Sequence, residues 1–254
     1  MPTTASRSAL ERALASHGLR LCGGWIPAPR DTLAGLPAGS GAAVVWMVGQ
    51  VGSECWAAFS NSRFFADGLP DPMDRWSKSI GDALAHAHGG MAVYPSDGPP
   101  YAPFQQWARR AEPLQASPLL LQIHPRWGLW HAYRFALVLP DLVAADAQSL
   151  SAADAQSLSA AAPARVAADI CLSCDGQPCL RRCPVGAFRD GGYDANVCTG
   201  HLHQPQGRDC MSGGCLARRA CPVAPDLQYQ PAHAAFHMRA CAGLRWPEPA
   251  GRLG

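Results

Sequence analysis

The stretch Cys171–Pro184, CLSCDGQPCLRRCP, decides how the chain around it folds. Its four cysteines have the spacing C-x2-C-x4-C-x3-C and end on a Cys-Pro pair. Thiols this close together can wrap around one metal centre, while the proline turns the chain away after the last of them. The chain has eleven cysteines, and only Cys22 and Cys55 precede Cys171. We therefore expect metal chemistry in the C-terminal third.

A second set of four cysteines follows the first and also closes on Cys-Pro. Its members are Cys198, Cys210, Cys215 and Cys221, the last of which precedes Pro222. Two sets that both end this way match a pseudo-symmetric exchange, in which the fourth cysteine of each set serves the metal centre of the other. One centre then takes Cys171, Cys174, Cys179 and Cys221. The other takes Cys183, Cys198, Cys210 and Cys215.

These sets resemble the cysteine pattern of bacterial dicluster ferredoxins, C-x2-C-x2-C-x3-C-P. The first set has two additional residues before its third cysteine. The looser second set resembles the C-terminal module of epoxyqueuosine reductases and reductive dehalogenases. The resemblance implies a loop-rich, ferredoxin-like domain with two 4Fe-4S clusters that passes single electrons to a redox partner protein. The flanking Arg181, Arg182, Arg218 and Arg219 either stabilise the added electron or are plain surface charges.

Zinc is the alternative metal, since eight cysteines also suffice for two tetrahedral sites of four thiolates. Zinc ribbons more often have two C-x2-C knuckles with a long spacer, and they do not require the Cys-Pro ending. His201 and His203 follow Cys198 and could replace a thiolate, but with eight cysteines present we expect both on an exposed loop. The remaining cysteines match no motif and are expected to be buried thiols, namely Cys22, Cys55 and Cys241.

Residues 1–140 have the helix and strand patterns of a mixed α/β domain. Ser8-Ala-Leu-Glu11 has the capping-box pattern of a helix start, and Gly18 is the expected stop. Asp71-Pro72 opens a longer helix that ends at Gly89. Strands are expected at 41–51, 119–124 and 131–140. The whole chain is therefore expected to be of the α+β class, with this mixed α/β domain first.

Residues 141–164 separate that domain from the cysteine-rich domain, 165–254. They contain the octapeptide AADAQSLS twice, at 144–151 and 152–159, followed by AAAPA. Two copies are too few for a solenoid, which needs three or more repeats. Ala- and Ser-rich composition of this kind is typical of a linker, so we place a domain boundary here.

Residues 117–140, SPLLLQIHPRWGLWHAYRFALVLP, resemble a segment of the cobalamin-processing chaperone of the cobalamin C type. The matching positions are His124, Pro125, Arg126, Gly128, Trp130 and Arg134. The resemblance implies a flavin-reductase-like scaffold and a cobalamin site with contacts at Trp130 and Arg134, and His124 is a third candidate. The alternative is a buried strand whose Arg and His have partners within the protein.

Two functions follow from these expectations. In the first, the chain is an iron-sulfur electron-transfer protein whose N-terminal domain is a docking or structural module. In the second, it is a cobalamin-dependent reductase or cobalamin-processing protein, in which the clusters reduce a corrinoid held by the N-terminal domain. His86 and His88 are not expected to bind a cofactor, because residues two apart do not share a helix face.

Charge and hydropathy exclude several other classes. There are 21 Lys and Arg against 19 Asp and Glu, and a net charge of +2 leaves no electrostatic footprint for nucleic acid or an anionic membrane. The first twenty residues contain charges where a signal peptide is apolar, and no stretch of 18 apolar residues follows. We therefore expect a cytoplasmic protein. No GxGxxG, P-loop, GxSxG or HExxH pattern occurs.

Overall fold

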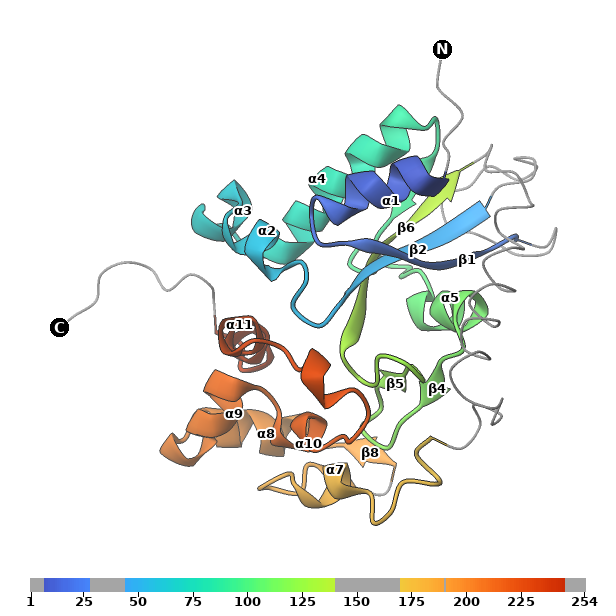
Figure 1. Cartoon of the computed structure of the whole chain (residues 1–254). Coiled ribbons are helices and arrows are strands. Elements are labelled where there is room, and N and C mark those ends of the chain that lie inside the picture. The colour runs from blue at the N-terminus through green and yellow to red at the C-terminus, as the bar shows by residue number, and fades with distance from the viewer. Residues whose placement is uncertain (1–6, 28–43, 140–169, 190, 245–254) are drawn as a thin grey trace.

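The computed structural model describes residues 7–27, 44–139, 170–189 and 191–244. A four-stranded antiparallel sheet with helices on both faces forms the first unit, and short helices and loops form the second (Figure 1). Both kinds of element are therefore present in the arrangement of an α+β fold, as expected from the sequence. The expected linker, 141–164, lies outside the described residues.

The central sheet has the strand order β1-β2-β6-β3, and every neighbouring pair is antiparallel. Its strands are β1 (Arg20–Trp25), β2 (Val44–Val51), β3 (Met91–Val93) and β6 (His131–Leu139). β2 is apolar because it is buried on both faces. Val44 and Trp46 belong to the core on one side, and Val45 and Met47 belong to the core on the other. The expected strands at 41–51 and 131–140 are confirmed over their described residues.

The expected strand at 119–124 is wrong over its first half. Only Gln122–Ile123 (β5) is a strand, and it pairs with Gln115–Ala116 (β4). Leu120 lies in a turn with φ of 58°, and its amide donates to Ser117 O. A turn interrupts the apolar run, so Leu120 and Leu121 stay exposed at 52% and 42%.

Helices cover both faces of the sheet (Figure 1). One face carries α1 (Arg7–Ala15) and α4 (Pro72–Ala87), with α2 (Trp56–Ser60) and α3 (Arg63–Ala66) at its end, and the other carries α5 (Phe104–Ala111). Ser8 is not a cap, because α1 already includes Arg7. Asp71 makes no capping hydrogen bond, although Pro72 opens α4 as expected. Gly18 and Gly89 have positive φ values and end their helices as expected.

The cysteine-rich unit consists of short elements. These are α7 (Pro178–Arg181), β7 (Phe188–Arg189), β8 (Gly192–Tyr193), α8 (Ala195–Leu202), α9 (Arg208–Gly213), α10 (Leu216–Arg219) and α11 (Pro231–Cys241), with 3-10 turns at Pro205–Gly207 and Pro225–Leu227. Asp194 caps α8, since its carboxylate accepts from the Val197 amide at 3.0 Å. Helices this short depend on tertiary packing for their stability.

The two units share one hydrophobic core. Phe236 of α11 lies 5.2 Å from the Phe59 ring and 5.8 Å from the Trp56 ring, measured between ring centroids. Ser53, in the turn after β2, accepts a hydrogen bond from the Gln230 amide at 2.8 Å. The cysteine-rich unit is therefore packed against the sheet unit and has a defined position there.

Candidate functional site

The first group of cysteines gathers around α7 and the end of α10. Cys171 and Cys174 lie in the turn before α7, Cys179 lies in α7, and Cys221 follows α10. Gly176 allows this turn because its φ is +62°, a conformation that side chains disfavour. Burial, and after it the neighbouring thiols of Cys221, Cys179 and Cys174, raise the pKa of Cys171 to about 11. These four thiols are therefore close enough to act on one another.

The second group lines a single cavity of about 360 Å³, the thiol cavity. Its cysteines come from the loop after α7 (Cys183), from α8 (Cys198), from α9 (Cys210), from the start of α10 (Cys215) and from the end of α11 (Cys241). The Ala187 amide donates to Cys183 Sγ at 3.3 Å. Most other wall residues are apolar, among them Val185, Leu216 and Met238. Besides the thiols, the polar side chains of the wall are Tyr193, His201, Arg218 and His237.

The geometry of both groups bears on the choice of metal. Four thiolates around one zinc ion lie about 4 Å apart, because each Zn–S bond is about 2.3 Å long. The thiolates of a cubane are bonded to four different irons and stand farther apart. Within the described ranges, no group of three or more His, Cys, Asp or Glu side chains is placed for a single ion. The thiol cavity, at about 360 Å³ and with five cysteines on its wall, has room for a group larger than a single ion.

Several other cysteine and histidine positions have clear outcomes. Cys22 and Cys55 are buried, at 2% and 0% exposure, as expected. The expectation for Cys241 is wrong, since it is exposed and its side chain lines the thiol cavity. The expectation for His201 is also wrong, because it lies in α8 and lines the same cavity. His203 and His86 are exposed, as expected.

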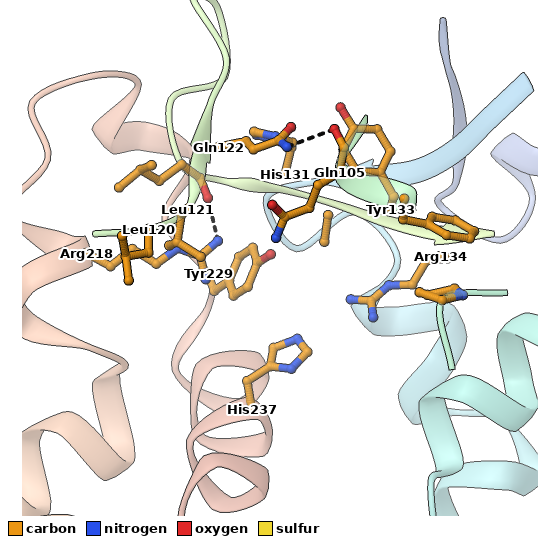
Figure 2. Close-up of a pocket in the computed structure, with 14 residues that line it drawn as sticks. Gln105, Leu120, Leu121, Gln122, His131, Tyr133, Arg134, Arg218, Tyr229 and His237 are labelled. Atoms are coloured by element: carbon orange, nitrogen blue, oxygen red, sulfur yellow. Dashed lines mark hydrogen bonds between the residues drawn. The ribbon is translucent and has the colours of Figure 1, made fainter. Parts of the chain in front are cut away.

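A second cavity, of about 420 Å³, lies between the sheet and the cysteine-rich unit (Figure 2). We call it the interdomain cavity. Its wall is formed by Pro95, Phe104, Gln105, Leu120, Leu121, Gln122, Leu129, His131, Ala132, Tyr133, Arg134, Arg218, Tyr229 and His237. Figure 2 shows Arg134 of β6 and His237 of α11 pointing toward the same space. Among the described residues that line this cavity, none is acidic.

The interdomain cavity adjoins the thiol cavity. Both are lined by Leu120, Leu121, Arg218 and His237. A third space of about 50 Å³, lined by Trp130, Cys215 and Tyr229 among others, lies at the same junction. A group bound by the second set of thiols would therefore be separated from the interdomain cavity by single side chains.

Arg218 lines both cavities and contacts residues of both units. Its guanidinium carbon lies 4.7 Å from the Trp130 ring centroid and 4.5 Å from the Tyr229 ring centroid. A guanidinium in this position is attracted by both ring faces. Its Nη2 also donates to the backbone oxygen of Leu129. Sequence reasoning named Arg218 only as a charge flanking the cysteines, and the interaction with the sheet unit was not visible in the pattern.

Of the three cofactor positions expected in the N-terminal domain, only Arg134 lines the interdomain cavity. Its Nε donates to Gln50 Oε1 at 2.6 Å. His124 is buried at 4% exposure and stacks on Trp127, with ring centroids 4.1 Å apart. Trp130 is buried at 3% exposure and contacts Arg218. The alternative expectation, a buried side chain with partners within the protein, therefore holds for His124, because its Nδ1 accepts hydrogen bonds from two backbone amides.

A chain of hydrogen bonds that sequence reasoning missed ends at the interdomain cavity. Ser53 Oγ lies 3.0 Å from His233 Nδ1, and His233 Nε2 lies 3.0 Å from His237 Nε2. Burial is the main cause that lowers the pKa of His233 to about 3 and that of His237 to about 2, so both are neutral near pH 7. The one signal in the sequence was the i, i+4 spacing of these histidines, which puts them on one helix face.

Comparisons of the chain with protein-family models, curated proteins and solved structures return no match. No helix in the described residues is long and apolar enough to cross a membrane. The assignment of a function therefore depends on the geometry of the thiol groups and the two cavities.

The buried His124 makes stability dependent on pH. Burial, and after it the charges of His131 and Arg126, lower the pKa of His124 from 6.5 to about 3. Glu112 does not reverse this shift, since its nearest oxygen is 3.9 Å from Nε2 and its other oxygen accepts from Tyr133. The unfolded state thus takes up a proton first as the pH falls, and stability is lost from about pH 6.5 downward.

At about pH 5 the histidine lowers the free energy of unfolding by about 2 kcal/mol relative to about pH 7.5. His124→Asn keeps an acceptor near the Nδ1 position and does not titrate, so it should lose about 2 kcal/mol less than the wild type over that range. Urea unfolding followed by tryptophan fluorescence at the two pH values measures this. His86→Asn, an exposed control, should behave like the wild type. Equal losses in all three proteins would contradict the prediction.

Proposed function

We propose that the protein is an iron-sulfur electron-transfer protein that holds two 4Fe-4S clusters. The observation that supports this is the grouping of its thiols. Cys221, distant in sequence, lies with the first three cysteines, while Cys183 lies with the second set. This grouping supports the exchange that the two Cys-Pro endings predict for a dicluster domain. The ferredoxin-like assignment of residues 165–254 is part of the same proposal.

The described residues would hold and tune the clusters. The thiols must lose their protons to bind iron, and burial raises the pKa of Cys171, Cys179, Cys210 and Cys221, so iron binding releases protons and is favoured at higher pH. Each cluster, when bound, supplies one-electron chemistry. Arg218 places a positive charge beside Cys221, which stabilises added negative charge.

In this proposal the sheet unit is a flavin-reductase-like module that docks against the clusters, and a redox partner protein supplies the electrons. A cytoplasmic location is part of the same proposal, because reducing compartments keep thiols available to bind metal and the chain has eleven cysteines.

Cys174→Ala tests the proposal. Anaerobically reconstituted wild-type protein should contain the iron and acid-labile sulfide of two cubanes, and the variant should lose about half of both because one cluster lacks a ligand. Cys55→Ala is the matched control, since Cys55 is buried in the core of the sheet unit. Wild-type iron content in Cys174→Ala, or zinc in place of iron in the purified wild type, would refute the assignment.

A second candidate function is a corrinoid reductase, in which the clusters reduce cobalamin held by the sheet unit. Arg134 supports it, since it is one of the residues matched to the cobalamin-processing chaperone and it lines the cavity next to the second thiol group. His124 and Trp130 do not line that cavity. A corrinoid would therefore have to contact the protein through Arg134 and residues that the resemblance does not include.

Titration with cob(II)alamin under anaerobic conditions separates the two candidates. If the cavity takes a corrinoid, the cobalt EPR signal changes with saturation, and Arg134→Ala weakens the binding by about tenfold, the equivalent of one charge-assisted hydrogen bond. Arg63→Ala, which alters an exposed arginine of α3, should bind like the wild type. An unchanged EPR signal at high micromolar cobalamin would leave the electron-transfer function alone.

A further inference from the structure

We propose that the interdomain cavity binds a small organic anion, with its carboxylate or phosphate group between Arg134 and Arg218. Both guanidinium groups reach the wall of this cavity, Arg134 from β6 and Arg218 from α10 (Figure 2). Among the described residues of the wall there is no carboxylate to balance them. Asp74 interacts electrostatically with Arg134 from outside this cavity, but a cavity lined by two arginines and by no carboxylate among its described residues still favours an anion.

Hydrogen-bonding capacity at the same place is unused. Arg134 Nη2 and Arg218 Nε are buried from solvent, and neither has a partner among the described residues. A buried charged donor without an acceptor costs free energy, and an oxyanion supplies strong acceptors for such groups. These two nitrogen atoms are the donors that would have to turn toward the cavity to reach a bound oxyanion.

The apolar residues of the wall indicate that the bound anion also has an apolar organic portion. Phe104, Leu121 and Tyr229 give it an apolar, aromatic lining. The volume of about 420 Å³ lies in the lower part of the range found for small-molecule sites. The anion therefore has an apolar or aromatic portion, which distinguishes this site from one for free phosphate.

The anion site adjoins the thiol cavity, since Arg218 and His237 line both cavities. The binding of the anion itself does not require the clusters, and its test is therefore separate from that of the iron.

Leu121 allows a matched test. It is 42% exposed and lines the cavity, so Leu121→Glu adds a negative charge to the wall without disturbing the core, and Leu121→Gln is the control of equal size. Isothermal titration calorimetry of the reconstituted protein uses two probes with an aromatic ring, phenyl phosphate and benzoate. Leu121→Glu should bind the preferred probe about tenfold more weakly than Leu121→Gln because of charge repulsion. Arg134→Gln should bind it more weakly than the wild type.

The preferred probe identifies the group, phosphate or carboxylate. No binding of either probe at millimolar concentration, or equal affinities for Leu121→Glu and Leu121→Gln, would overturn the proposal. Iron measured on the same samples keeps the two proposals apart. Loss of the clusters with anion binding intact refutes only the electron-transfer function, and full iron content without anion binding refutes only the anion site.

A different observation, the fifth cysteine of the thiol cavity, carries a second inference. A cubane takes four thiolates, yet five cysteines line this cavity. Cys241 is the last residue of α11, which packs against α9, the helix that carries Cys210. The thiol of Cys198 is close enough to Cys241 to act on it electrostatically. We infer that Cys241 is an alternative ligand of the second cluster and can replace Cys198.

The exchange is balanced without an oxidant. The bond between iron and Cys198 breaks and that thiolate takes up a proton, while Cys241 loses a proton and forms the new bond. No electron is transferred, so the cluster keeps its charge. Cys241 is exposed, so its proton can pass directly to solvent.

Iron and acid-labile sulfide content test the inference, which rests on the two-cluster proposal. Cys198→Ala and Cys241→Ala should each keep the full iron content of the wild type, and the double variant should keep about half. Cys198→Ala combined with Cys55→Ala is the control and should keep the full content. Half the iron in Cys198→Ala alone, or full iron in the Cys198→Ala/Cys241→Ala variant, would overturn the inference. Wild-type protein without iron would refute the cluster proposal instead.

Discussion

The position of Arg218 between the rings of Trp130 and Tyr229 is the interaction on which the arrangement of the site depends. Trp130 directly precedes β6, Tyr229 precedes α11, and Arg218 lies three residues from both Cys215 and Cys221. Each guanidinium–ring contact contributes about 0.5–2 kcal/mol, depending on how far it is desolvated. The same guanidinium donates to Leu129 O. One side chain therefore ties both cysteine groups to the end of the central sheet.

Few interactions within the cysteine loops stabilise their conformation. Their helices are short, and burial raises the pKa of several thiols that lie next to one another. In the proposed function, iron supplies the missing interactions, because metal binding to such loops contributes free energy to folding. The shared core at Phe236 and the Arg218 contacts then keep the loops in place on the sheet side. In the proposed function, the stability of the cysteine-rich unit therefore has two sources, the bound metal and the contacts with the sheet unit.

The thiol cavity and the interdomain cavity lie next to each other at the interface between the two units. A redox centre is useful when its electron has a short path to an acceptor, and here the thiol cavity and the interdomain cavity have common walls. The half-buried His237 lines both cavities, and its hydrogen bond to His233 continues to Ser53 at the edge of the sheet unit. In the two proposals, a small anion would lie in the cationic cavity between the two units, next to the cluster that the thiol cavity would hold.

The sequence by itself determined the local features. The spacing of the cysteines and their Cys-Pro endings predicted the two groups of thiols, the apolar run at Val44–Val51 predicted a buried strand, and Pro72 and Gly89 marked the ends of α4. These depend on contacts between near neighbours or on backbone preferences that a residue carries with it. Only the tertiary structure decided the rest, because it depends on segments far apart in sequence. It brought Cys241 and His201 to the wall of the thiol cavity. It connected His237 to Ser53 through hydrogen bonds with His233. It also placed Arg134, but not His124, on the wall of the interdomain cavity. No spacing rule predicts how α10 and α11 pack against the sheet unit. That packing brings Arg218 and His237 to Leu120 and Leu121, and these four residues form the common wall of both cavities.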